Sequence, residues 1–191
     1  MTLVDTRDTP IERITETGIR TSERDCEFDI IVYATGFDAL RGAFDRIDFR
    51  GMDGVTLKEM WKDGATSLVG MLQDGFPNMF MLLGPHAALG NIPRSIEFNV
   101  DWVTRLLRHM QANGLTRAEA KPEAMAKWMD HVMEVAAGLL SMEVDSWMTG
   151  VNVNVEGRQV RRVARYTGSA PTYRAWAEEI AARGYAGLAL N

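Results

Sequence analysis

Residues 78–97 read NMFMLLGPHAALGNIPRSIE. The apolar run 79–83 predicts a short buried strand, which ends at Gly84-Pro85. Small residues follow, and a helical apolar pattern begins at Ser95. This order predicts a strand, a glycine-containing loop and a long helix, a sequence of elements that is typical of α/β proteins.

Three main helices are predicted in the C-terminal half. Residues 95–111 have helical apolar spacing and stop at Asn113-Gly114. Residues 122–140 begin with a proline in the first turn, and residues 170–183 end at a glycine. The expected apolar stripes are Ile96, Val100, Val103, Leu107 and Met110 in the first helix, and Met125, Met129, Val132 and Ala136 in the second.

The first third of the chain is predicted to be rich in β-structure. Residues 9–20 suggest a hairpin or meander, and residues 28–34 (FDIIVYA) read as a strand buried on both faces. A further strand is expected at 67–72, and a short helix at 56–61 with Thr56 and Glu59 as a capping box. The fold class is therefore α/β, with a β-rich part followed by helices.

Composition limits the classes of function. The chain has 191 residues and a net charge of −5, which argues against a general nucleic-acid binder. A single cysteine excludes an internal disulfide, and three widely spaced histidines give no metal site. No apolar run approaches the roughly 20 residues of a membrane span, and the N-terminus lacks a signal-peptide pattern. We therefore expect a cytoplasmic protein without a membrane partner.

Three segments could carry chemistry. Thr35-Gly36 ends the predicted strand 28–34, where α/β sheets bind ligands, although an ordinary turn explains the spacing more simply. The small residues of loop 84–90 allow a flat ring system to approach the main chain, or serve only close packing. Trp147 lies in a glycine-bearing loop, where tryptophan stacks on a ligand or simply packs. His86 has no acidic or nucleophilic neighbour in sequence, so it is not assigned as a general base.

Other patterns are less informative. The sequence has no GxGxxG loop, Walker loop or GxSxG elbow. Residues 141–169 form a long irregular segment, which is usually functional or disordered. Its arginines between 158 and 165 suit either a phosphate site or a solvated surface.

The whole chain resembles the C-terminal portion of Baeyer–Villiger monooxygenases, a family of FAD- and NADPH-dependent flavoproteins. The resemblance rests on six segments in this order: TPIERITETGIRT, FDIIVYATGFDAL, GFPNMFMLLGPHAALGNIPRSIE, VDWVTRLL, DSWMTGVN and YTGSAPTYRAWAEEIAARGYAGLAL. It implies an incomplete version of a fold with two dinucleotide-binding domains. Residues 1–39 would end the NADPH-binding domain, including the ATG turn. Residues 40–191 would form the C-terminal part of the FAD-binding domain with its helical tail.

The resemblance also implies cofactor-binding residues, but no catalytic residue in this chain. Thr35 and Gly36 match the turn that lines the cofactor cleft, Gly84 and Pro85 open the loop whose residues Asn91 and Ile92 pass the flavin, and Trp147 matches a tryptophan that closes over the nicotinamide. The family's glycine-rich loops, histidine fingerprint and catalytic arginine are absent. VNVEGRQ replaces a Pro-Gly-Lys-Pro stretch of many members.

These implications lead to a functional expectation with two alternatives. The chain is expected to be an inactive fragment of an enzyme that inserts oxygen into a ketone to give an ester or lactone. Its partners would be the ketone, the missing N-terminal half and, through exposed apolar surface, another copy of itself. The alternatives are a fragment of a flavin monooxygenase that oxygenates nitrogen or sulfur, and a non-catalytic dimerisation or interaction domain.

Overall fold

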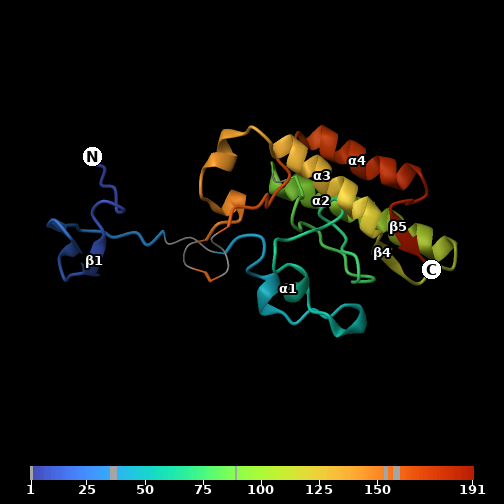
Figure 1. Cartoon of the computed structure of the whole chain (residues 1–191), viewed down its shortest axis with the longest axis horizontal. Helices are drawn as coiled ribbons and strands as arrows, with labels where there is room; N and C mark the ends of the chain where they lie inside the picture. Colours follow the sequence, from blue (N-terminus) through green and yellow to red (C-terminus); the bar gives the residue numbers. More distant parts are fainter. Residues whose placement is uncertain (1, 35–37, 89, 153–154, 157–159) are drawn as a thin grey trace. The chain divides into compact units, whose positions relative to one another are not determined.

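The computed structural model describes residues 2–34, 38–88, 90–152, 155–156 and 160–191. It divides into an N-terminal unit of residues 1–36 and a C-terminal unit of residues 37–191 (Figure 1). The N-terminal unit contains a small sheet, and the C-terminal unit contains the helices.

The sheet of the N-terminal unit has three antiparallel strands, which confirms the hairpin or meander expected for residues 9–20 and extends it to residue 27. Its strands are β1 (Ile11–Ile14), β2 (Gly18–Thr21) and β3 (Asp25–Glu27), hydrogen-bonded in that order. The central strand begins at Gly18, a position without room for a side chain, because a Cβ there would collide with the carbonyl oxygen of Cys26.

The strand expected at 28–34 does not form. Ile30 is 80% exposed and Val32 81% exposed, and no described strand pairs with this segment. A strand buried on both faces needs hydrogen-bonded neighbours, and the described residues provide none here. Its β-branched composition alone is therefore insufficient, because β-propensity depends on packing against adjacent strands.

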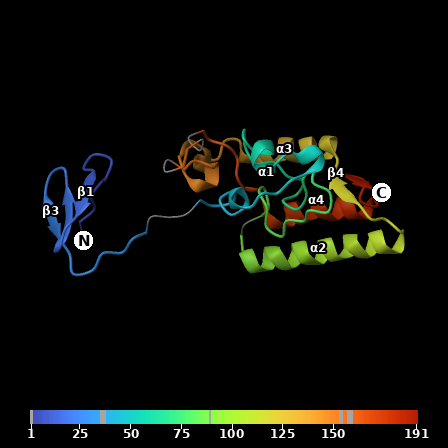
Figure 2. The ribbon, with the colours of Figure 1, turned by 90° about the horizontal axis from the view of Figure 1, so that it is seen from below.

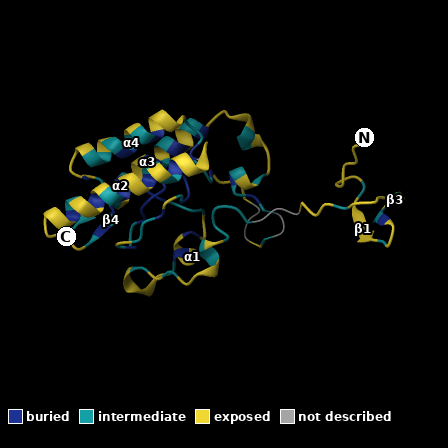
Figure 3. Ribbon diagram, turned by 180° about the vertical axis from the view of Figure 1, so that it is seen from behind, coloured by how far each residue is buried: buried dark blue, intermediate teal, exposed yellow. Residues whose placement is uncertain are grey.

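The C-terminal unit is built on three long helices, as the sequence predicted (Figure 2). They are α2 (Ile92–Ala112), α3 (Pro122–Ala136) and α4 (Ala170–Ala182), accompanied by the antiparallel strand pair β4 (Ala118–Ala120) and β5 (Leu188–Leu190). The shorter elements are η1 (Phe44–Arg46), η2 (Met52–Gly54), α1 (Leu57–Met60), η3 (Leu140–Glu143) and η4 (Trp147–Thr149). The helices turn their buried faces inward and their exposed faces outward (Figure 3).

Helix α2 differs from its prediction in its start and in its buried face. It begins three residues earlier, because the Asn91 side chain caps it by accepting from the Arg94 N–H at 3.1 Å. The expected stripe residues Val100 and Leu107 are partly exposed, at 39% and 47%. Trp102 is buried instead, and its indole N–H donates to the carbonyl of Ala177 in α4. The large indole therefore determines which face of the helix packs.

The remaining helix predictions are largely confirmed. Thr56 and Glu59 form the expected capping box of α1. Helix α3 ends at Ala136 rather than at 140, and fully buried Trp128, which was not in the expected stripe, is the largest side chain on its inner face. Helix α4 ends as expected before Gly184, which has a φ of +65°.

Two further expected strands do not form. Residues 67–72 form one tight loop closed by a single bridge between Leu68 and Leu72, with Gly70 at a φ of +67°. Residues 79–83 are not a strand, although the Met81 N–H donates to the Met71 carbonyl. Positive φ values within residues 67–72 reverse the direction of the chain before a β-ladder can extend.

The described helices include none that is long and apolar enough to cross a bilayer. Residues 141–169 are irregular apart from η3 and η4 in the part that the structure describes, as expected from the sequence.

Candidate functional site

The loop after Gly84 is clamped to the turn at 67–70. The Gly84 N–H donates to the Gly70 carbonyl at 3.0 Å, and the Ser67 hydroxyl donates to the Pro85 carbonyl at 2.6 Å. The main chains approach closely here, since a Cβ on Gly70 would lie 2.7 Å from the Cβ of Ala87. Loop 84–88 is therefore held rigidly from one side by main-chain contacts.

His86 holds the same loop from the other side. Its side chain is fully buried, its φ is +63°, and its Nε2–H donates to the Val163 carbonyl at 2.8 Å. A carbonyl can only accept, so a proton lies on Nε2. Burial lowers the pKa of His86 to about 4, which keeps the imidazole neutral at pH 7. His86 is thus a structural link to residues 163–164.

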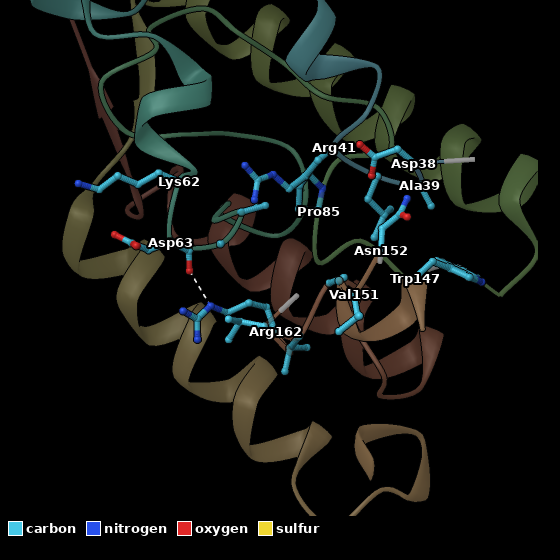
Figure 4. A pocket seen from close by; sticks show the side chains of 17 residues that line it. Asp38, Ala39, Arg41, Lys62, Asp63, Pro85, Trp147, Val151, Asn152 and Arg162 are labelled. Atoms are coloured by element: carbon cyan, nitrogen blue, oxygen red, sulfur yellow. Dashed lines mark hydrogen bonds between the residues drawn. The ribbon is translucent and has the colours of Figure 1, made fainter. Parts of the chain in front are cut away.

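A cavity of about 170 Å³ lies beside Pro85 (Figure 4). Its walls come from four chain segments and from Pro85. The lining residues are Asp38, Ala39, Leu40, Arg41, Lys62, Asp63, Gly64, Ala65, Pro85, Trp147, Gly150, Val151, Asn152, Val160, Arg162, Val163 and Ala164. Three cationic and two acidic side chains line an otherwise mainly apolar space. Such a cavity suits an organic ligand that carries an anionic group.

Arg162 joins two walls of this cavity. Its Nε–H donates to the Asp63 carbonyl at 2.7 Å (Figure 4). Its backbone N–H donates to the Thr149 carbonyl at 2.7 Å. Its Cδ lies 3.3 Å from the position that a Cβ on Gly64 would occupy. The arginine stem therefore packs against the main chain that its head group binds.

Arg162→Ala is expected to lower the free energy of unfolding by about 1–2 kcal/mol, because a charge-assisted hydrogen bond and its packing are lost. Arg161→Ala is the matched control, since Arg161 pairs with Asp145 at the surface and such pairs contribute about 0–1 kcal/mol. Urea denaturation of both variants measures the difference. An equal loss in the two would show that Arg162 does not hold the cavity walls together.

Trp147 stands at the rim of the cavity on a short, well-braced turn. The Thr149 hydroxyl donates to the Val144 carbonyl and accepts from the Ser146 N–H, and Gly150 closes η4 with a φ of +71°. Trp147 lines the cavity and is 48% exposed, so it is only half-buried. This geometry presents an aromatic face without burying it in the core.

The structure brings together some of the residues selected from the sequence. Trp147 and Pro85 line the cavity, and Gly84 precedes Pro85 in the chain without lining it. Asn91 and Ile92 lie at the start of α2 and do not line it. Thr35 and Gly36 lie outside the described residues. The assignment of these seven residues to cofactor binding stays a prediction.

The charged lining residues were not selected from the sequence. Arg162 belongs to the arginine-rich stretch, for which the sequence left both a phosphate site and a solvated surface open. Lys62 and Asp63 follow α1 without any motif. The hydrogen bond from Arg162 to the Asp63 carbonyl joins residues that are 99 positions apart and brings their two segments to one cavity.

Comparison with known proteins identifies the origin of this fold. No profile of a known protein family matches the chain. Curated relatives include acetone monooxygenase (methyl acetate-forming) of Gordonia sp., 40% identical over 100% of this chain and 36% of the relative. Cyclopentanone 1,2-monooxygenase of Comamonas sp. is 38% identical over 100% of the chain and 34% of the relative. Phenazine N-monooxygenase PhzNO1 of Lysobacter antibioticus is 36% identical over 100% of the chain and 35% of the relative.

Solved structures agree with these sequence matches. A closed crystal structure of cyclohexanone monooxygenase superposes with a TM-score of 0.88 at 37% identity, over 98% of this chain and 35% of that one. A crystal structure of the OTEMO complex with FAD and NADP gives a TM-score of 0.85 at 35% identity, over 98% of this chain and 34% of that one. The chain therefore has part of the fold of flavoproteins with two dinucleotide-binding domains.

The chain is a homologue of the Baeyer–Villiger monooxygenases, which confirms the resemblance found in its six sequence segments. It spans about a third of the length of the curated relatives that it matches.

Proposed function

We propose that this chain is the C-terminal part of an FAD- and NADPH-dependent monooxygenase that inserts one oxygen atom of O₂ into a ketone, giving an ester or lactone. The strongest support is the agreement of the fold, over 98% of the chain, with an enzyme solved with FAD and NADP. Residues 1–39 would end the NADPH-binding domain, and residues 40–191 would belong to the FAD-binding domain. A cytoplasmic location and self-association are further parts of the proposal.

The cavity residues fit such cofactors chemically. The half-exposed ring of Trp147 can stack on a nicotinamide, and Arg162 and Lys62 can neutralise a phosphate. FAD, when bound, supplies the oxygen chemistry, whereas the protein binds, orients and excludes water. Gly84, Pro85, Asn91, Ile92, Thr35 and Gly36 complete the proposed cofactor contacts. No catalytic residue is assigned to this chain.

Titration of the purified chain with FAD and with NADPH tests its dependence on a partner. We expect neither tight binding nor oxidation of NADPH with a cyclic ketone, because the phosphate-binding glycine loops are absent. Flavin and tryptophan fluorescence report binding. Tight FAD binding with turnover by the chain alone would contradict the proposed dependence.

Co-expression with the remaining two thirds of a related enzyme tests the activity itself. The complex is expected to retain flavin and to convert acetone or cyclopentanone into an ester or lactone. Trp147→Ala in this complex is expected to weaken NADP⁺ binding by up to about tenfold, because a stacked aromatic pair contributes about 0.5–1.5 kcal/mol. Trp147→Phe keeps an aromatic face and serves as the control. Equal NADP⁺ affinity in both variants would exclude stacking by Trp147.

Oxygenation of nitrogen is a second candidate, which the match to phenazine N-monooxygenase favours. The same complex supplied with a phenazine distinguishes the two, because an N-oxide rather than an ester is then the product. A complex that forms no product and a chain that only self-associates would instead support an interaction domain.

A further inference from the structure

A cluster of aromatic rings surrounds Trp128 in the core of the C-terminal unit. Its ring stacks on Tyr166, with 5.1 Å between centroids and 26° between planes. Trp176 lies 5.5 Å from Trp128 and stacks on His131 at 4.8 Å. Trp128 is fully buried, whereas Trp176 is partly exposed and lines a groove of about 340 Å³ between α3 and α4. Contacting rings thus lead from the core to the surface.

Tyr166 and His131 form a hydrogen-bonded pair inside this cluster. The phenol oxygen of Tyr166 lies 3.1 Å from Nε2 of His131, and Tyr166 is only 1% exposed. Burial raises the pKa of the Tyr166 phenol, so it keeps its proton in the resting protein. An imidazole nitrogen is a base that can take this proton when the phenol becomes strongly acidic.

We propose that Tyr166 and His131 are a redox-active pair, connected to the surface through Trp128 and Trp176. In this reaction a one-electron oxidant takes one electron from the Tyr166 ring, and the phenolic proton moves to Nε2 of His131. The products are a neutral tyrosyl radical, an imidazolium and the reduced oxidant. One O–H bond breaks, one N–H bond forms, and re-reduction reverses both transfers.

The unpartnered indole N–H of Trp128 favours movement of an electron vacancy from Trp128 to Tyr166. Its N–H is buried and has no hydrogen-bond partner among the described residues. An oxidised Trp128 therefore cannot pass its proton to a neighbouring base, whereas an oxidised Tyr166 can. An electron vacancy that enters at Trp176 is expected to pass through Trp128 and to settle on Tyr166.

The pair also lies beside the loop that forms the candidate site. The Tyr166 N–H donates to the Ala87 carbonyl at 3.2 Å, and Tyr166 forms a β-bridge with Ala88. If loop 84–92 passes the flavin, the pair can reduce a one-electron oxidant that forms at that site. This physiological role rests on the proposed function, but the redox chemistry of the pair does not.

Photo-oxidation of the purified chain tests the pair without any flavin. A ruthenium polypyridyl label is attached through Lys127→Cys, because Lys127 lines the same groove as Trp176. Cys26→Ser removes the only native thiol, and Tyr33→Phe removes an exposed tyrosine. After photogeneration of Ru(III), time-resolved absorption should show a neutral tyrosyl radical, which forms more slowly in D₂O because a proton moves with the electron.

Variants identify the residues that are involved. Tyr166→Phe should abolish most of the tyrosyl signal and leave a tryptophan radical. His131→Gln keeps a hydrogen-bond acceptor but not a base, and should slow tyrosyl formation by about tenfold or more. Tyr185→Phe is the matched control: Tyr185 is buried and contacts the His109 ring, with no hydrogen bond from its hydroxyl to that ring among the described residues. Circular dichroism checks that each variant is folded.

Three results would overturn the proposal. They are a radical that stays on tryptophan in the labelled parent chain, a tyrosyl signal unchanged by Tyr166→Phe, and a rate unchanged by His131→Gln. Because no flavin is present, such a failure leaves the proposed monooxygenase function untouched. If the tyrosyl radical forms as expected but the complemented enzyme is inactive, the redox pair is supported and the proposed monooxygenase function is contradicted.

Discussion

Gly70→Ala is expected to lower the free energy of unfolding by about 3 kcal/mol or more, which is a large effect for one methyl group. Gly70 has a φ of +67°, a region that L-residues rarely occupy. The new Cβ would also lie 2.8 Å from the Cα and the backbone nitrogen of Ala87. Both atoms belong to loop 84–88, which cannot move away without breaking its bonds to Ser67 and Gly70.

Gly184→Ala separates the two causes of this loss. Gly184 has nearly the same φ, +65°, but an added Cβ there would meet no atom within 4 Å. It should cost only about 1–2 kcal/mol, the penalty of the left-handed conformation itself. Thermal and urea unfolding of the two variants gives the comparison. Equal losses would mean that the close approach between Gly70 and Ala87 contributes nothing, and that loop 84–88 is free to shift.

The helices could be predicted because their signals are local. Glycine after α4 and proline at the start of α3 act within one turn of the residues that they affect. The rotation of α2 could not be predicted, because it depends on the hydrogen bond from Trp102 to Ala177, 75 positions away. The sequence pattern of α2 permits either apolar face to be buried.

The strands expected at 28–34 and 79–83 show the opposite case. Both segments have the apolar composition of buried strands, but a strand exists only where another strand supplies its hydrogen bonds. The meander of the N-terminal unit is the strand prediction that is confirmed, and it contains its own partners in adjacent sequence. Local pairing is what made it predictable.

Some residues of the candidate site could likewise be predicted from the sequence, whereas others could not. Trp147 and Pro85 could be selected because they lie in recognisable sequence segments. Arg162 and Asp63 could not, because neither has a motif and their contact spans most of the C-terminal unit. The aromatic pair of Tyr166 and His131 was missed for the same reason, because the two residues are 35 positions apart and neither has a motif.

Lowering the pH from 6.5 to about 5 is expected to remove about 2 kcal/mol of stability through His86 alone. The pKa of His86 is about 4 in the folded chain, against 6.5 for an ordinary histidine. The unfolded chain therefore binds a proton more readily between these two values. The contribution of His86 is fully present above pH 6.5 and is lost as the pH falls towards 4, where the loss reaches about 3 kcal/mol.

His86→Asn isolates this effect, because asparagine does not titrate and tolerates the positive φ of this position. The variant starts with lower stability, since the bond to the Val163 carbonyl is lost, but its stability should change less between pH 6.5 and 5. His109→Gln leaves His86 in place and controls for the removal of a histidine at another position. Urea unfolding at several pH values measures all three chains above the range where most carboxylates titrate.

If the free energy of unfolding changes with pH equally in the parent and in His86→Asn, the charged imidazole must reach solvent without unfolding of the chain. Loop 84–88 would then have to detach from residues 163–164, because the folded chain buries His86 completely. Pro85 and Val163 both line the cavity, so that detachment would open one of its walls. Amide hydrogen exchange decides between the two routes. Acid unfolding through His86 exposes the N–H of Tyr166 only together with the core helices, whereas local opening exposes it first.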